Sequence, residues 1–408
     1  MRRFVFAGAS HRAYSMFFKG LEPKLGESID FVGIYDPNRT RCEVFQREIG
    51  EGLKIYSDFD LMLDTERPDG VIVATTDNTH AEYVIRALDK GYDVYSEKPL
   101  TNTYENCFKI REAEKRSGKR VAVTFNCRFM PYFAKVKELL MSGIIGRVYS
   151  INYEYTLNRW HGGDYFKRWH KHMEISQGML VHKSTHHFDI INWLLEDEPS
   201  KVAAIGNRVF YGNPEKAFGE RCSTCSKADK CESYKSQSAK MDKALYFEAE
   251  HEDGYIRDAC AYAPNTDIYD NMSVSVLYKK GTVLTYSLNL FSMREGYTMT
   301  ITGEEGTLLL HNIANGYEAC SDKYEIILLK RDGGVRHIIF DAAEGAHGGG
   351  DAKLLDMMFG EGEIDDPLGQ YADSYAGVTS AIIGIAANDS IATGRTVILD
   401  EMLEKLKD

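Results

Sequence analysis

The chain has 408 residues, which is long enough for two domains rather than one small core. It has 61 acidic and 49 basic side chains, and the resulting net charge of -12 argues against a general binder of nucleic acid or anionic membranes. The hydrophobic content of 43%, without an apolar run of membrane-spanning length, predicts a soluble globular protein. Residues 1–8 enter a strand at once, which argues against a signal peptide. Eight cysteines are too few for a disulfide scaffold in a chain of this size and favour the reducing cytoplasm.

The first predicted elements are a buried strand over residues 4–7 and a helical pattern that runs through Phe18. The turn between them, Gly8-Ala9-Ser10-His11-Arg12-Ala13, occupies the position of the dinucleotide fingerprint G-x-G-x-x-G. Glycines there let a pyrophosphate approach the helix amino end. Because Ser10 and Ala13 replace two of the three glycines, an ordinary tight turn remains an alternative.

The next strand, over residues 30–35, ends at Asp36. A carboxylate in this place holds the ribose hydroxyls of NAD and repels the extra phosphate of NADP. Two alternatives stay open. Arg39 or Arg41 could bind that phosphate instead, and Asp36 could simply cap the following helix.

Strands over residues 71–74, 93–95 and 121–125 alternate with helices over residues 81–90 and up to about Arg116. This alternation predicts a parallel, doubly wound sheet, in which ligands bind outside the carboxyl ends of the strands. Four polar signatures fall at those ends: Gly8, Asp36, Thr75 and Lys98. The pattern therefore predicts a dinucleotide site at this edge.

Lys98 stands between Glu97 and Pro99, directly after the strand over residues 93–95. The proline removes a backbone donor and keeps Lys98 out of the helical region. Lys98 is thus expected to be held in one place at the ligand-binding edge.

Residues 71–80 together with Glu97-Lys98-Pro99-Leu100 resemble the Gfo/Idh/MocA oxidoreductases, named for glucose–fructose oxidoreductase, inositol dehydrogenase and a rhizopine-catabolism protein. Asn126-Cys127-Arg128-Phe129, residues 143–148 and the segment around His186-His187-Phe188-Asp189 extend the resemblance over nearly the whole chain. It implies an amino-terminal Rossmann domain over residues 1–124. It also implies a carboxyl-terminal α/β domain over residues 125–408, whose large, mostly antiparallel sheet carries the sugar-binding face and often a dimer or tetramer interface.

The strand-end pattern and the resemblance together predict an NAD site. Its expected residues are Gly8, Ser10, His11, Arg12, Asp36, Arg39, Thr75, Thr76, Asn78, His80, Glu97, Lys98 and Asn126.

From Ile151 onward the chain is rich in aromatics and histidine, and Arg168-Trp169-His170 is the densest part. Aromatic faces that stack on sugars, beside Arg and His donors, are typical of a carbohydrate site. Arg128 and His186 complete the expected substrate-binding set. The alternative is a tyrosine-rich sheet surface at a subunit interface.

His182, His186 and Asp189 match the family's catalytic segment, and Ser184 or Thr185 is the expected cap of the helix that follows. The resemblance implies that His186 accepts the hydroxyl proton while Lys98 polarises the same oxygen or relays that proton. His182 replaces a residue that is usually a carboxylate and is expected to orient one of them. His186 could also be a buried core histidine, or His182 and His186 could ligate a metal at H-x-x-x-H spacing.

Residues 207–260 are predicted to be a polar insertion. Its cysteines, Cys222, Cys225 and Cys231, have the C-x2-C-x5-C spacing of a zinc half-site, and Cys260 is the natural fourth thiolate. Free thiols and an iron–sulfur cluster are the alternatives.

Residues 273–278, 282–290, 297–302 and 307–310 alternate like antiparallel strands, with turns at Gly281 and residues 303–306. His347-Gly348-Gly349-Gly350-Asp351 then opens a helix, and in relatives this turn lies near the active-site mouth. A last helix over residues 376–394 is apolar enough to belong to the core.

These features predict an NAD-dependent oxidoreductase acting on a secondary hydroxyl of a sugar, sugar derivative or cyclitol. A second hypothesis is a glycosidase that keeps NAD tightly bound and works by transient oxidation and elimination. A third is a binding protein without chemistry, against which the presence of both Lys98 and His186 speaks.

Overall fold

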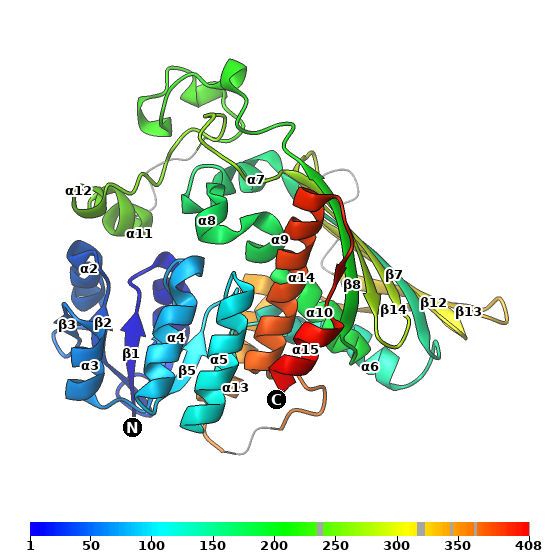
Figure 1. The fold of residues 1–408 in the computed structure, drawn as a ribbon, viewed down its shortest axis with the longest axis horizontal. Coiled ribbons are helices and arrows are strands. Elements are labelled where there is room, and N and C mark those ends of the chain that lie inside the picture. Colours follow the sequence, from blue (N-terminus) through cyan, green and yellow to red (C-terminus); the bar gives the residue numbers. More distant parts are fainter. Residues whose placement is uncertain (235–239, 316–322, 343–345, 363–364, 408) are drawn as a thin grey trace.

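The structure, a computed structural model, describes residues 1–234, 240–315, 323–342, 346–362 and 365–407. Two sheets organise it, and Figure 1 shows them on opposite sides of a central layer of helices. None of the helices in the described part has both the length and the apolar composition needed to cross a membrane.

The amino-terminal sheet has six strands in the order β3-β2-β1-β4-β5-β6, and all neighbours are parallel. This confirms the predicted doubly wound sheet. Only β3 was not expected from the sequence. The strands are β1 (Arg2–Ala7), β2 (Ile29–Tyr35), β3 (Lys54–Tyr56), β4 (Gly70–Val73), β5 (Asp93–Ser96) and β6 (Val121–Val123). The helices around them are α1 (Lys19–Leu21), α2 (Arg39–Ile49), α3 (Phe59–Glu66), α4 (His80–Asp89) and α5 (Tyr104–Ser117).

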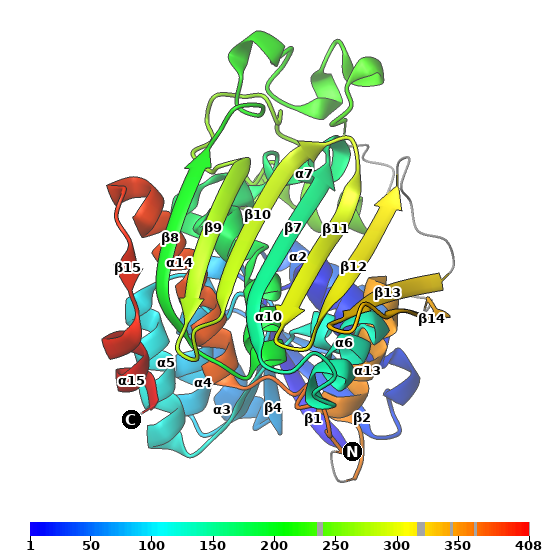
Figure 2. The same cartoon turned by 90° about the vertical axis from the view of Figure 1, so that its right-hand side faces the viewer.

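The second sheet has nine strands in the order β14-β13-β12-β11-β7-β10-β9-β8-β15. Only β7 and β10 run parallel, so the expectation of a large, mostly antiparallel sheet is confirmed. The strands are β7 (Val148–Asn158), β8 (Pro199–Asn207), β9 (Asn271–Tyr278), β10 (Val283–Ser292), β11 (Glu295–Gly303), β12 (Gly306–Asn315), β13 (Lys323–Lys330), β14 (Val335–Asp341) and β15 (Val397–Ile398). In Figure 2 the helices lie behind this sheet, and none of the described helices covers its outer face.

The helices of the second domain lie mostly between the two sheets. They are α6 (Pro131–Met141), α7 (Arg159–Tyr165), α8 (Met173–Ser176), α9 (Gly178–His182), α10 (Thr185–Leu195), α13 (Gly350–Phe359), α14 (Ser374–Thr393) and α15 (Asp400–Lys407). Ser184 stands at the amino end of α10 as predicted, but its hydroxyl bonds the Met179 carbonyl and Tyr286 instead of capping the helix.

Helix α14 joins the two domains and corresponds to the helix predicted over residues 376–394. It is apolar around most of its circumference, which is typical of a helix buried on all sides. A Cβ atom on Gly377 would lie 2.8 Å from Leu100 Cδ2, so the helix packs closely against the Rossmann domain. It is not the last helix, because α15 follows it.

Helix α13 returns to the first domain although it lies far along the chain. The Phe359 ring packs against Phe4 and Tyr95, with centroid distances of 5.1 and 4.6 Å. Helix α13 therefore completes the core of the first sheet, although it follows the boundary predicted at residue 124.

The segment between β8 and β9, residues 208–270, has the low content of regular structure expected of an insertion. Figure 1 shows it arching from the second domain to α2. Its described elements are short turns at Pro214–Lys216, Cys222–Thr224 and Ala228–Lys230, then α11 (Lys240–Asp242), a π-helical turn at Lys243–Phe247 and α12 (Glu250–Asp253).

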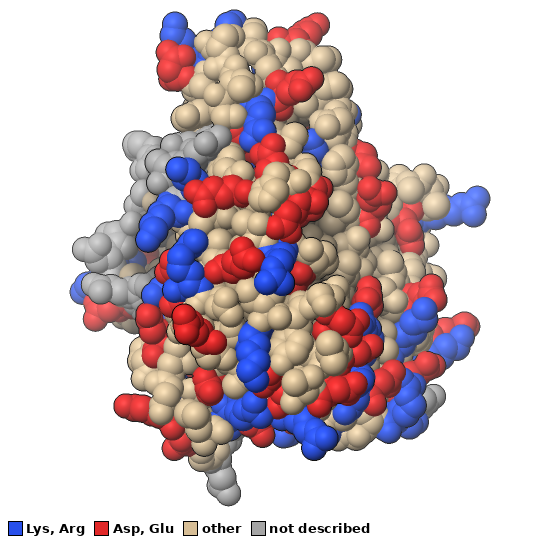
Figure 3. Space-filling model, turned by 90° about the vertical axis from the view of Figure 1, so that its left-hand side faces the viewer, with Lys and Arg blue, Asp and Glu red and all other residues tan. Residues whose placement is uncertain are grey.

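Across the face in Figure 3, basic side chains are interspersed with acidic ones, and the described residues form no large patch of one sign there.

Candidate active site

The carboxyl ends of β1 and β4 meet at a close backbone approach. Gly8 follows β1 with φ +100°, and a Cβ atom there would lie 2.7 Å from the Ala74 carbonyl oxygen. Only glycine fits this position. The strand order changes direction between β1 and β4, which is where a doubly wound sheet binds its ligand. The residues present therefore fit a dinucleotide.

The turn after Gly8 is tied to other parts of the chain. Ser10 Oγ accepts a hydrogen bond from Ala13 N–H at 3.1 Å. The His11 N–H donates to Tyr246 Oη at 2.9 Å, and the His11 ring lies 2.9 Å from Asp242. These contacts bring residues 240–257, called the strap below, over the cofactor-binding edge.

Asp36 lies at the end of β2 as predicted. Its carboxylate accepts hydrogen bonds from the N–H groups of Ala9 and Asn38, each at 2.8 Å. Burial raises the pKa of Asp36, and these two bonds partly offset the effect. The cap of α2 is Asn38, whose side chain accepts from Arg41 N–H, so Asp36 is not that cap.

The cations near Asp36 are engaged within the protein. Arg39 Nε pairs with Glu43 at 3.0 Å, and Arg41 pairs with Asp253 of the strap at 2.7 Å. Glu252 accepts from the N–H groups of Arg39 and Thr40, at 2.7 and 2.9 Å. A carboxylate thus already occupies the amino end of α2, where a ribose phosphate of NADP would otherwise find donors.

The residues after β4 form a tight polar turn. Thr79 Oγ1 donates to Thr75 Oγ1 at 2.8 Å, and Thr76 Oγ1 donates to Asn78 Oδ1 at 2.9 Å. His80 reaches the Pro99 carbonyl from Nδ1 at 2.7 Å. Burial lowers the pKa of His80, so its ring is neutral near pH 7 and this shorter contact is where we place its proton. His80 therefore holds the segment that carries Lys98.

Lys98 lies at the centre of the site. Its ammonium donates to the carbonyl oxygen of His182 at 3.1 Å, which joins the two domains. Burial lowers the pKa of Lys98 to about 8, although Asp77 and Glu97 act in the opposite direction. A lysine with such a pKa takes up and releases protons near neutrality.

Asp77 and His182 form a buried pair across the domain boundary, with Asp77 Oδ2 2.7 Å from His182 Nδ1. Burial raises the pKa of Asp77 and lowers that of His182. The adjacent Lys98 favours a charge on the carboxylate, so we place the proton on Nδ1 of a neutral imidazole. His182 Nε2 then remains a hydrogen-bond acceptor.

An aromatic wall surrounds His182. Trp169 stacks on His170 with a centroid distance of 3.6 Å, and His170 meets the His182 ring edge-on at 4.1 Å. Arg168 pairs with Asp164 at 3.1 Å and lies over the ring of Tyr165. The structure thus brings the predicted residues Arg168, Trp169 and His170 together beside the Asp77–His182 pair.

His186 lies in the first turn of α10 and is 7% exposed. Its ring packs edge-on against Phe125, at a centroid distance of 6.1 Å. Among the described residues, no third potential ligand joins His182 and His186 at the spacing of a bound ion.

Arg128 is bonded mostly within the protein. Its guanidinium forms a buried, two-point ion pair with Asp189, at 2.6 and 2.8 Å, and also donates to the carbonyls of Gly369 and Tyr371. Most of its donors are therefore used inside the protein. These bonds give Arg128 a positioning role, and its contact with substrate stays a prediction.

A charged network borders the site. Glu97 pairs with Arg12 at 2.7 Å, Arg12 lies 3.5 Å from Asp351, and Asn126 Nδ2 donates to Asp351. A Cβ atom on Gly350 would lie 2.6 Å from the Asn126 carbonyl oxygen. The turn over residues 346–351 thus opens α13 beside Asn126, as expected. The side chain of His347 lies outside the described residues.

Sequence reasoning missed two groups in this region, Asp77 and Lys183. Lys183 follows His182 directly, and its charge acts on both Lys98 and His182. The position of Asp77 after β4 could have indicated it, because Thr75 and Thr76 at the same edge of the sheet are already predicted to belong to the NAD site.

Comparison with known families decides the assignment. The profile described as "Oxidoreductase family, NAD-binding Rossmann fold" matches residues 3–125, and the one described as "Oxidoreductase family, C-terminal alpha/beta domain" matches residues 137–399. The chain belongs to the Gfo/Idh/MocA oxidoreductase family. Its first domain is therefore an NAD-binding Rossmann domain.

The sequence matches to two relatives cover very different shares of this chain. YteT of Bacillus subtilis, named as an oxidoreductase, is 33% identical over 440 aligned residues that cover 99% of each chain. Inositol 2-dehydrogenase 2 of Saccharopolyspora erythraea is 33% identical over 149 residues, 36% of this chain and 41% of that protein.

Among solved structures, an Agrobacterium radiobacter oxidoreductase in complex with NAD+, L-tartaric acid and magnesium has the same fold. It superposes with a TM-score of 0.68 at 16% identity, and the match covers 98% of this chain and 99% of the other.

Proposed function

We propose that this oxidoreductase transfers a hydride between nicotinamide and a secondary hydroxyl of a sugar, sugar derivative or cyclitol. The observation that carries the proposal is the meeting of Lys98 with the Asp77–His182 pair at the carboxyl edge of the Rossmann sheet. The aromatic wall of Trp169 and His170 beside that pair suits the face of a sugar ring. The likeness to inositol 2-dehydrogenase supports the same substrate class.

The cofactor is proposed to be NAD, which supplies the hydride acceptor when bound. Gly8 and Ser10 would border its pyrophosphate, Asp36 its ribose, and Thr75, Thr76 and Asn78 the region after β4. Arg12, Glu97 and Asn126 form the network behind that region.

Residues of the protein accept and relay the proton of the substrate hydroxyl. Removal of hydride from an alcohol requires this proton to leave as well. We assign its uptake to His186 and its relay to Lys98, whose pKa of about 8 suits transfer near neutrality. Asp77 and His182 hold each other and, through the His182 carbonyl, hold Lys98.

NAD is proposed to be preferred over NADP. Asp36 remains at the end of β2, and the carboxylate of Glu252 lies at the amino end of α2. Hydrogen bonding from Thr40 keeps the pKa of Glu252 below its ordinary value, so Glu252 stays charged. Both carboxylates repel an added phosphate.

A redox-assisted glycosidase is the second candidate, and the strap is the observation that favours it. The contacts of Tyr246, Asp242 and Glu252 with the cofactor edge are those expected of an enzyme that retains its nucleotide. Such an enzyme cleaves a glycoside without releasing NADH, whereas a dehydrogenase releases NADH in proportion to product.

A homo-oligomer is proposed from the outer face of the second sheet. Ile205 and Val283 are exposed on that face, which carries none of the described helices. Light scattering on the purified chain should give a dimer or tetramer, and a monomer at working concentration would contradict this proposal.

The experiment that tests the function is a panel of sugars, sugar acids and cyclitols read at NADH absorbance. Mass spectrometry of the purified protein comes first, to detect retained nucleotide. NADH formation with at least one secondary alcohol is expected. Glycoside cleavage without NADH release would favour the second candidate.

A further inference from the structure

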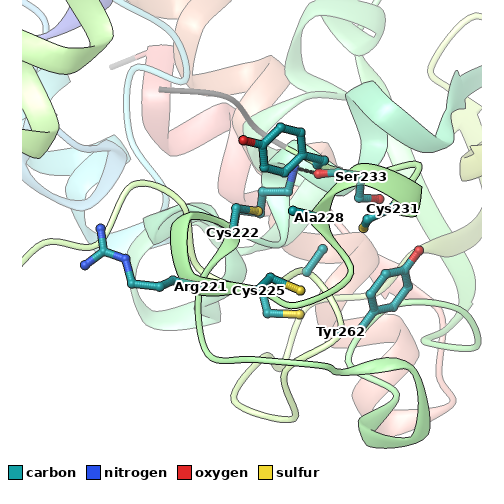
Figure 4. A pocket seen from close by; sticks show the side chains of 11 residues that line it. Arg221, Cys222, Cys225, Ala228, Cys231, Ser233 and Tyr262 are labelled. Carbon is teal, nitrogen blue, oxygen red and sulfur yellow. Dashed lines mark hydrogen bonds between the residues drawn. The ribbon is translucent and has the colours of Figure 1, made fainter. Parts of the chain in front are cut away.

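Four cysteines of the segment between β8 and β9 line one small cavity. Cys222, Cys225, Cys231 and Cys260 all contribute to its wall, and its volume is about 20 Å³. Figure 4 shows Cys222, Cys225 and Cys231 around this space, with Arg221 turned away from it. A volume of this size suits one water molecule or one ion better than a cluster of several irons.

The backbone brings these cysteines together from separate stretches. The Cys222 N–H donates to the Asp258 carbonyl at 2.7 Å, and the Cys260 N–H donates to the Glu220 carbonyl at 2.8 Å. These bonds set the two stretches antiparallel. The Cys225 N–H then closes a turn onto the Cys222 carbonyl at 3.3 Å, and the Cys231 N–H closes another onto Ala228 at 3.2 Å. The turns place thiols, rather than aliphatic side chains, at the centre of the segment.

The surroundings of the cavity favour a negatively charged occupant. Lys167 lines it, is only 1% exposed, and donates its ammonium to the neutral carbonyl of Ser233. A divalent ion held by four thiolates carries a net negative charge, which would offset the buried cation of Lys167.

We propose that Cys222, Cys225, Cys231 and Cys260 bind one structural zinc ion. Zinc takes four thiolates in tetrahedral geometry, and its binding releases the thiol protons. Among the described residues no three ligands already stand at the spacing of a bound ion. The thiols are therefore expected to close on the ion by side-chain rotation. A site closed by four thiolates has no open position for substrate, so the ion stabilises structure.

The ion would also support the strap over the cofactor edge. Arg221, next to Cys222, pairs with Asp258 at 2.7 Å and with Glu250 at 2.7 Å. Glu250 begins α12, which carries Glu252 to the amino end of α2. Loss of the ion should therefore loosen residues 240–257 and weaken nucleotide retention.

Elemental analysis of the purified full-length chain tests this proposal. About one zinc per chain is expected after dialysis against metal-free buffer. Cys225→Ser and Cys231→Ser should each lose most of that zinc, while Cys42→Ala, in α2 and away from the cavity, should keep it. The zinc-depleted wild type should also be cut faster by protease within residues 208–270.

Two further measurements make the test independent of how the variants fold. Cobalt added to zinc-depleted wild type should give the strong visible absorption of a tetrahedral thiolate site. Folded wild type that contains no zinc after growth in zinc-supplemented medium would overturn the proposal. Iron with inorganic sulfide, or disulfides between these cysteines, would overturn it equally.

Discussion

Asp77 acts on Lys98 through charge, which gives a prediction with a definite sign. Because Asp77 raises the pKa of Lys98, Asp77→Asn should lower that pKa below about 8. Alcohol oxidation releases a proton, so kcat/KM should rise with pH through the pKa of the relay. In Asp77→Asn the rising limb should move to lower pH.

The pH profile of kcat/KM measures this shift. Asp64→Asn, an exposed carboxylate paired with Lys90, is the matched control and should leave the limb in place. If the rising limb of kcat/KM does not move in Asp77→Asn, Lys98 is not the group whose titration sets that limb.

Replacement of Lys98 should remove turnover without removing the cofactor. Lys98→Ala is expected to lower kcat by about 10²- to 10⁴-fold, the range typical of a lost proton-transfer group. Lys98→Arg should fail almost as badly, because a guanidinium stays protonated. Steady-state kinetics and NAD titration measure the two effects, with Lys90→Ala as a surface control. Near-normal turnover of Lys98→Ala would make the lysine structural.

The proposed preference for NAD over NADP rests on Asp36 and Glu252. Asp36→Ala should narrow the gap between NAD and NADP, because it removes both the ribose hydrogen bonds and the repulsion. Glu252→Gln should tighten NADP binding by roughly threefold to tenfold. The neutral amide removes the negative charge that repels the phosphate of NADP at the amino end of α2. Calorimetric titration measures both. Tighter binding of NADP than NAD by the wild type would show that Arg39 or Arg41 governs the pocket.

At the scale of elements, helices and strands with regular patterns could be predicted from the sequence. Contacts between segments far apart along the chain could not. Buried runs such as β4 and the helix α5 follow from periodicity alone. Strand β3 has only three residues and no fully buried position, so it gave no signal. The hairpin of β13 and β14 is largely exposed on β14, which blurs the alternation.

The candidate site divides in the same way. Lys98, His182 and His186 could be chosen as candidates because each lies in a recognisable local segment, and the structure brings Lys98 to the His182 carbonyl. The bond between Asp77 and His182 joins residues 105 positions apart, and nothing in either local sequence indicates it. The strap is similar, because Tyr246 reaches His11 only after the insertion crosses the domain boundary.

The strap gives the prediction at this scale. Tyr246→Phe keeps the ring but removes the oxygen that accepts from the His11 N–H. NAD should then dissociate more readily, and its Kd should rise by about twofold to tenfold, the range for one hydrogen bond. Titration calorimetry tests this against Tyr149→Phe, an exposed residue of β7 outside the strap. An unchanged Kd would mean that the strap does not retain the nucleotide.

At the scale of the whole molecule, Lys98 comes from the first domain and His186 from the second, and the bond from Lys98 to the His182 carbonyl joins the two domains. Residues that act as one unit give strongly non-additive effects. The double variant Lys98→Ala/His186→Ala should therefore be little slower than either single variant. Full additivity in kcat would contradict a shared proton path.

The most direct test of the account uses a substrate that carries deuterium on the carbinol carbon. Any secondary alcohol that forms NADH in the panel serves, and the reduced cofactor is analysed by mass spectrometry. The account predicts that the wild type moves deuterium to the nicotinamide ring, and that Lys98→Ala binds NAD but moves almost none. Glycoside cleavage in which the product keeps its carbinol deuterium, with no labelled cofactor released, would contradict it.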